Sequence, residues 1–274
     1  MSTLWLYELP LWVSGTFILI VLMLAIEFGF RFGLSIRRSN EKAGDATRGD
    51  VTLGALLALL GLLLAFTYAF SLGRADLRKQ AVLHEANAIS TAFLRADLAA
   101  EPGRTVLRKR LLEYTRTRVV SQEMANTQEE MKQVVQRSLK AQAELWPATK
   151  RALEGDIPGP IQASIVSAIN GVLDAHTMRL GAALDRIPGV VLVLIVLVAA
   201  ISLATAAYIA GLRGYMSRLR MGAFAFVLAA LLVVIIDFDM PLHGLIQRND
   251  ESLATLVPEM EASLADRYTL HSAE

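Results

Sequence analysis

Four long apolar stretches divide the chain. They cover residues 11–30, 51–72, 190–212 and 221–240, and their charged residues are Glu27 in the first and Asp237 and Asp239 at the end of the last. About 20 residues of helix cross a hydrocarbon core of roughly 30 Å. We therefore predict four transmembrane helices. The first is not expected to be a cleavable signal peptide, because residues 1–12 lack Lys and Arg and the apolar run is long.

The segment between the second and third spans is polar but helical in pattern. Residues 73–99 follow the second span without Pro, so we predict one helix that joins a membrane bundle to a water-exposed domain. Apolar residues recur at helical spacing over 104–144, which predicts an amphipathic helix about 60 Å long. Turn signals at 101–103 and 155–160 bound it and a further helix over 161–185.

No stretch alternates as a strand would, so the predicted class is all-α. We expect four transmembrane helices, an extramembrane helical hairpin or bundle over 73–188 inserted between spans two and three, and an acidic tail over 242–274.

Composition supports a membrane protein with a sizeable polar part. The chain is 54% hydrophobic, its mean hydropathy is +0.45 and its net charge is +1. It contains no Cys, which excludes disulfides, thiolate metal sites and Cys nucleophiles.

Charge in the short loops predicts the orientation. Basic residues cluster at 31–48 and 213–220, and positive charge marks the cytoplasmic side. Both termini and the 73–188 segment are therefore expected outside. We expect the basic loops to touch anionic lipid rather than nucleic acid.

Two spans carry small residues on adjacent turns. Span two has Gly54, Ala58, Gly61 and Ala65, and span three has Ser202, Ala206 and Ala210. Such faces let helices approach closely in lipid, although they are frequent in membrane helices and specify no partner.

The charged helix after span two offers the first candidate site. Arg74, Arg78 and Glu85 share one face, and Asn87, Thr91 and Arg95 follow at four-residue spacing. These groups form either interhelical salt bridges and hydrogen bonds or a charged ring at an ion vestibule. The pore or vestibule candidates are Thr67, Tyr68, Ser71, Arg74, Arg78, Glu85, Asp237 and Asp239. The structural polar candidates are Glu27, Asp76, Asn87, Thr91, Arg95 and Asp97.

Acids at span ends are the second feature. Near-membrane carboxylates such as Asp237 and Asp239 are functional candidates, or else solvated interface acids, and Glu27 can pair with Arg31 at i+4. Acidic rings select cations and basic rings anions, so selectivity stays open. The four histidines, His176 among them, are isolated and fit surface or packing roles. We expect no metal site, no cofactor and no enzyme activity, because no nucleophile–base or phosphate-loop motif is present.

Several of these patches resemble the bacterial bestrophin-like family of four-span membrane proteins. They are Glu27-x-Gly29-x-x-x-Gly33, Gly61 to Phe66, Arg74-x-Asp76-x-Arg78, Glu85 to Asp97, Leu112-Glu113-Tyr114 and Asp237-Phe238-Asp239-Met240-Pro241-x-x-Gly244. The family usually has Arg where this chain has Met240. The resemblance implies a bacterial inner membrane and likeness to bestrophin channels, which are ion-conducting pentamers with a cytosolic bulk domain.

Two functions follow as hypotheses. The first is a homo-oligomeric ion channel whose second span lines the pore, with Thr67, Tyr68 and Ser71 near its outer mouth. The second is a non-conducting sensor or scaffold whose exterior helical domain binds a partner.

Overall fold

The computed structural model describes residues 10–39, 47–119, 128–240 and 251–271. Every regular element in these ranges is an α-helix, which confirms the all-α prediction. The described chain divides into two compact units, residues 1–75 with 186–246 and residues 76–185 with 247–274. Helix α2 (Thr47–Ala96) contributes to both units and is a single helix, as predicted from the absence of Pro.

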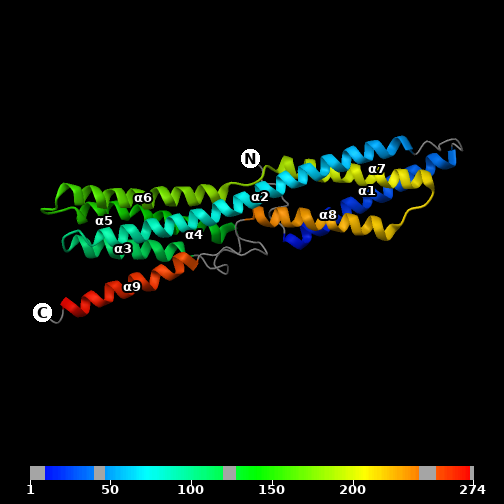
Figure 1. Ribbon diagram of the computed structural model, residues 1–274. Helices are drawn as coiled ribbons and strands as arrows, with labels where there is room; N and C mark the ends of the chain where they lie inside the picture. The colour runs from blue at the N-terminus through cyan, green and yellow to red at the C-terminus, as the bar shows by residue number, and fades with distance from the viewer. Residues whose placement is uncertain (1–9, 40–46, 120–127, 241–250, 272–274) are drawn as a thin grey trace. The chain divides into compact units, whose positions relative to one another are not determined.

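Unit 1 contains the four apolar spans. They belong to α1 (Leu11–Ser39), the first half of α2, α7 (Gly189–Arg213) and α8 (Arg218–Asp239), and all four are long and apolar enough to cross a membrane (Figure 1). The buried residues of α1 recur every three or four positions, from Ser14 and Ile18 to Gly29 and Gly33. That spacing places them on one face of a helix.

Glycines bring α1 and α7 into close contact. A Cβ added at Gly29 would lie 2.1 Å from the carbonyl oxygen of Ala204, and one at Gly33 would lie 2.3 Å from that of Tyr208. Backbones this close leave no room for any side chain, so these positions require glycine. Helix α7 ends at Arg213 and is capped by Gly214, whose φ of 78° is left-handed and favours glycine.

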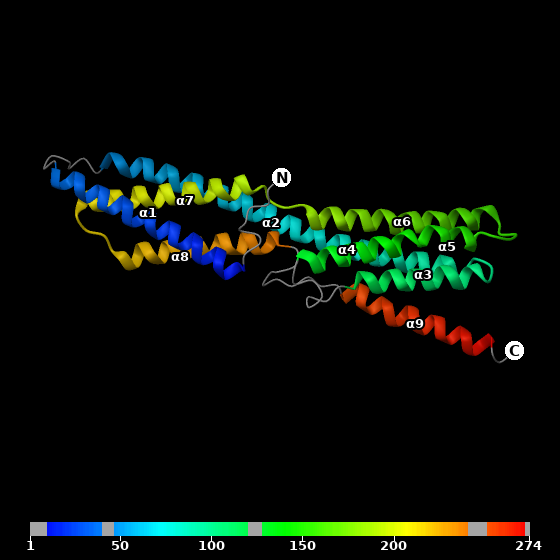
Figure 2. The same cartoon turned by 180° about the vertical axis from the view of Figure 1, so that it is seen from behind.

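In the described part of the chain, unit 2 consists of the second half of α2 and five further helices. They are α3 (Gly103–Arg118), α4 (Gln128–Ala143), α5 (Leu145–Ala152), α6 (Gly159–Leu184) and α9 (Glu251–His271). Helices α4 and α5 both contact α3, and α5 also lies beside α6 (Figure 2). Its core is Leu, Ile and Ala with the buried ring of Tyr114. Small alanines on α2, such as Ala86 and Ala92, let neighbouring helices approach.

One predicted helix is wrong in its extent. The helix expected over 104–144 ends at Arg118, because Val119 has an extended backbone with φ −78° and ψ 96°. Helices α4 and α5 occupy the rest of the expected range, and α5 begins at Leu145. Residues 40–46 after the first span, parts of the acidic tail and all of residues 241–244 lie outside the described residues.

Candidate functional site

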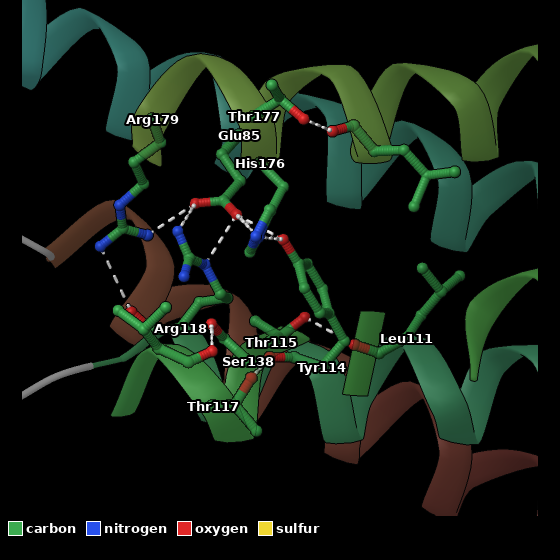
Figure 3. A network of polar contacts seen from close by, with 12 residues as sticks. Glu85, Leu111, Tyr114, Thr115, Thr117, Arg118, Ser138, His176, Thr177 and Arg179 are labelled. Atoms are coloured by element: carbon green, nitrogen blue, oxygen red, sulfur yellow. Dashed lines mark hydrogen bonds and ion pairs between the residues drawn. The ribbon is translucent and has the colours of Figure 1, made fainter. Parts of the chain in front are cut away.

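A buried carboxylate, Glu85, is the centre of a polar cluster in unit 2. Its Oε1 accepts hydrogen bonds from Arg118 Nε at 2.8 Å and from Tyr114 Oη at 2.5 Å. Its Oε2 accepts from Arg179 Nη1 at 2.6 Å. Figure 3 shows these side chains converging from α2, α3 and α6. One carboxylate therefore ties three helices together.

All members of this Glu85 cluster are withdrawn from solvent. Glu85 and Tyr114 have no exposed surface, His176 is 2% exposed, and the two arginines are nearly as buried. Burial pushes the pKa of the Glu85 carboxyl upward, but the guanidinium groups of Arg118 and Arg179 outweigh it and hold that pKa below its ordinary value. Glu85 is thus ionised, and two cations surround one anion.

The proton positions in the cluster follow from the hydrogen bonds. Burial, then the charge of Glu85, raises the pKa of the Tyr114 hydroxyl, so that group keeps its single proton and donates it to the ionised Glu85. The Tyr114 oxygen lies 3.0 Å from His176 Nδ1 and must accept there. His176 is therefore protonated at Nδ1, and its buried Nε2 makes no hydrogen bond within the described part of the chain. Burial, and then the charge of Arg118, lowers the pKa of His176 to about 4.

The cluster also closes the end of α3. Arg118 is the last residue of that helix, and its carbonyl oxygen lies 3.4 Å from Arg179 Nη2. A cation at the carboxyl end of a helix is favourable because the terminal carbonyls carry partial negative charge. Arg179 therefore acts on both the carboxylate and the helix end.

A second buried arginine, Arg108, links α3 to α2 and α9. Its guanidinium is 2.9 Å from Asp97, donates to Ser263 Oγ at 2.7 Å and lies 4.2 Å from the ring centre of Phe93. This combination of ion pair, hydrogen bond and cation–π contact explains how a fully buried arginine is tolerated.

In unit 1, the buried acid Asp239 lies at the end of α8. Its two carboxylate oxygens accept the backbone N–H of Ile187 at 3.1 and 2.9 Å, just before α7 begins. Arg74 Nη1 of α2 lies 3.9 Å from Oδ1. Asp239 therefore connects the end of α8 with the middle of α2 and with the entry to α7.

Neighbouring candidates of span two also take part in helix packing. Ser71 Oγ donates to the carbonyl of Ile235 at 3.1 Å, and Thr67 Oγ1 donates to that of Leu63 at 2.7 Å. Both are buried. Tyr68 is 37% exposed and meets Phe238 edge to face at 5.8 Å.

The remaining predicted residues are distributed over both units. Asp237 is buried, Arg78 is half-buried, and Asn87 and Thr91 are exposed. Asp76 accepts a hydrogen bond from Gln80, Arg95 donates to the Ser164 carbonyl, Asp97 pairs with Arg108, and Glu27 pairs with Arg31.

Sequence reasoning missed most of the Glu85 cluster. Tyr114 stands in the apolar spacing of the helix expected over 104–144, and an isolated histidine such as His176 indicates only a surface or packing role. Arg118, Arg179 and Arg108 carried no local signal, because their partners lie far away in sequence.

Span two has an outward face of small residues. Gly54, Ala58, Gly61, Ala65 and Ala69 are all exposed, and a Cβ added at Gly54 or Gly61 would meet nothing within 4 Å. At about 100° per residue these five positions lie within roughly 80° of one another. The single buried line of this span, which is Leu60, Leu64, Thr67 and Ser71, lies on another side of the helix.

Comparison with known proteins gives one match. A sequence model of the Bestrophin-like domain matches residues 18–253. The comparisons with curated proteins and with solved structures found no match.

Proposed function

This chain belongs to the bestrophin-like family, and from that relation we propose that it is a homo-oligomeric ion channel of a bacterial inner membrane. It is a membrane protein with four apolar helices. The proposed activity is not enzymatic.

The outward face of span two carries the proposal. Side chains that face lipid are usually large and apolar, and Leu62, Phe66 and Phe70 form such a surface on one sector of α2. The Gly54–Ala69 small-residue face lies on the adjacent sector, and no described residue lies within 4 Å of a Cβ placed at Gly54 or Gly61. Small faces in membranes are used for close helix contact. We propose that this face of α2 meets other subunits and that α2 helices surround the conduction path.

Conduction is tested with purified full-length protein in planar bilayers, after its oligomeric state has been measured in detergent. We expect discrete conductance steps. A folded oligomer that stays silent across several salts and voltages would reject the channel.

The role of the small face is tested by size measurement. Gly61→Leu should lower the oligomer mass and abolish conductance, because the added side chain holds neighbouring helices apart. Leu62→Phe on the lipid sector is the matched control and should leave both unchanged. If the two variants have the same oligomer mass and conductance, the small-residue face of α2 does not form the contact between subunits.

Orientation belongs to the same proposal. We propose that the residue 73–188 segment and both termini lie outside, with the short arginine-rich loops in the cytoplasm. Because the chain has no Cys, single substitutions give clean labels. Lys140→Cys should react with an impermeant maleimide on intact cells, and Arg220→Cys should react only after permeabilisation. The reverse pattern would invert the topology.

The sensor or scaffold is the second candidate, and the packing of α9 favours it. Leu253 and Met260 of α9 are buried in unit 2, and Glu261 pairs with Arg116 of α3 at 2.7 Å. Apolar anchors on one helix face are a common mode of helix recognition. The surface of unit 2 on which α9 packs would also suit a partner's helix. This function predicts a co-purifying protein and no ion flux from the folded oligomer.

A further inference from the structure

One end of unit 1 is rich in exposed arginine. Helices α1 and α7 end there and α8 begins there, and glycine contacts between α1 and α7 hold the two ends together. The exposed arginines at this end are Arg31, Arg37, Arg38, Arg213, Arg218 and Arg220. We call this surface the arginine end.

Only part of this charge is neutralised inside the described chain. Glu27 pairs with Arg31 at 2.8 Å and lies 3.9 Å from Arg218. Asp50 pairs with Arg213 at 2.9 Å. The described residues provide no carboxylate within ion-pair distance of Arg37, Arg38 or Arg220.

The position of two arginines is unfavourable for the helix that carries them. Arg218 and Arg220 lie in the first turn of α8, which contains no acidic residue. The amino end of a helix carries partial positive charge, so basic residues there are destabilising. An external negative charge would offset this cost.

Large apolar side chains lie among the arginines. Tyr215 is 72% exposed and Leu219 is 84% exposed, and Leu219 is flanked by Arg218 and Arg220. Exposed tyrosine and leucine side chains beside cations are typical of a protein surface at the level of the lipid headgroups. At that level the apolar side chains reach the edge of the acyl chains, while the arginines contact the headgroup phosphates.

We propose that the arginine end binds the headgroups of anionic lipids in the bilayer that holds unit 1. The apolar helices of unit 1 are long enough to cross the hydrocarbon core, so the ends of these helices lie at the level of the lipid headgroups. Arg37, Arg38 and Arg220 supply the charge that phosphate needs. Tyr215 and Leu219 favour a lipid surface over a soluble acidic partner, because a soluble partner would leave them unburied or would need a matching apolar patch.

The test uses the full-length protein in neutral detergent and measures binding of phosphatidylglycerol by native mass spectrometry. Phosphatidylcholine and inorganic phosphate at equal concentration form the other arms. The test variant is R37Q/R38Q/R220Q. The control is K79Q/R137Q/K140Q, which removes the same charge from exposed positions of unit 2.

Each basic residue near an anionic surface strengthens binding about fivefold, so the triple variant should lose affinity for phosphatidylglycerol on the order of a hundredfold. The control should lose less than about threefold, and added salt should weaken wild-type binding. Leu219→Gln should also weaken the binding of phosphatidylglycerol, although this substitution leaves the net charge of the protein unchanged.

Three results would overturn the proposal. They are equal losses in the two triple variants, equal retention of phosphatidylcholine and phosphatidylglycerol, and displacement of phosphatidylglycerol by inorganic phosphate. The last would indicate a site for free anions rather than a lipid surface.

Discussion

Removal of the Glu85 carboxylate tests whether the polar cluster holds unit 2 together. In Glu85→Ala the guanidinium groups of Arg118 and Arg179 stay buried without their shared anion, and Tyr114 loses its acceptor. Breaking a buried ion pair by deleting one partner costs about 3–5 kcal/mol. Domains are stable by only about 5–15 kcal/mol, so this loss is a large fraction of the total.

The assay follows thermal unfolding of the detergent-solubilised protein by tryptophan fluorescence. Replacing Trp5 and Trp12 by Phe leaves Trp146 on α5 as the reporter of unit 2. With about 3 °C per kcal/mol for a unit of this size, Glu85→Ala should lower the transition by about 10 °C. Glu113→Ala is the control, because Glu113 is half-exposed and pairs with Arg110 on the surface. It should cost less than about 1 kcal/mol.

A compensating variant separates charge imbalance from lost volume. Glu85→Leu together with Arg118→Met and Arg179→Met replaces the ions by apolar groups, and buried ion clusters replaced in this way often keep or gain stability. We expect most of the lost stability to return. The reasoning is refuted if Glu85→Ala melts within about 2 °C of wild type, or if the triple variant is no more stable than Glu85→Ala.

Three further predictions concern single positions. Folding lowers the pKa of His176 from an ordinary 6.5 to about 4. As the pH falls, the unfolded chain therefore takes up a proton at His176 before the folded chain does. The free energy of unfolding should decline between about pH 6.5 and pH 4, by up to about 3 kcal/mol. His176→Gln should flatten that decline, and parallel stability curves for variant and wild type would contradict it. Asp239→Asn weakens the acceptor of the Ile187 N–H and should cost unit 1 about 1–3 kcal/mol, read as a lower melting temperature; an unchanged melt would show that the carboxylate is dispensable. Gly29→Leu should abolish folded protein because its Cβ would overlap the carbonyl oxygen of Ala204, whereas Gly54→Leu should fold. The yield of folded protein is read from size-exclusion profiles. Equal yields for the two variants would refute the close contact between α1 and α7.

The spans and the helical class were predictable because burial in lipid and helical periodicity are local properties of the sequence. The end of α3 was not. The apolar spacing continues past residue 118, but the backbone turns extended at Val119, where Arg179 from α6 bonds the terminal carbonyl of the helix. That contact joins residues 61 positions apart. The spacing of apolar residues describes only adjacent turns of one helix, so it cannot predict a contact between two helices.

The same limit explains the interpretation of Glu85. Local spacing placed it on a face with Arg74 and Arg78, which left interhelical salt bridges and a charged ring as alternatives and named no partner for Glu85. In the structure its partners are Arg118 and Arg179, which are 33 and 94 residues away. Seven-residue spacing shows which groups share a face, but it cannot show that the face is buried.

Four of the motifs that carry the family resemblance meet in two pairs. The 74–78 block meets the 237–240 block through Arg74 and Asp239, and the 85–97 block meets the 112–114 block through Glu85 and Tyr114. Gly29 and Gly33 of a further motif pack on the backbone of α7. These motifs therefore contribute to helix packing, and their contacts assign no substrate. If the proposed channel activity is correct, the groups that set it are to be sought among exposed residues. Among the described residues, the Gly54–Ala69 face of α2 and the arginine end are exposed surfaces with a chemical reason to bind a partner helix or a lipid.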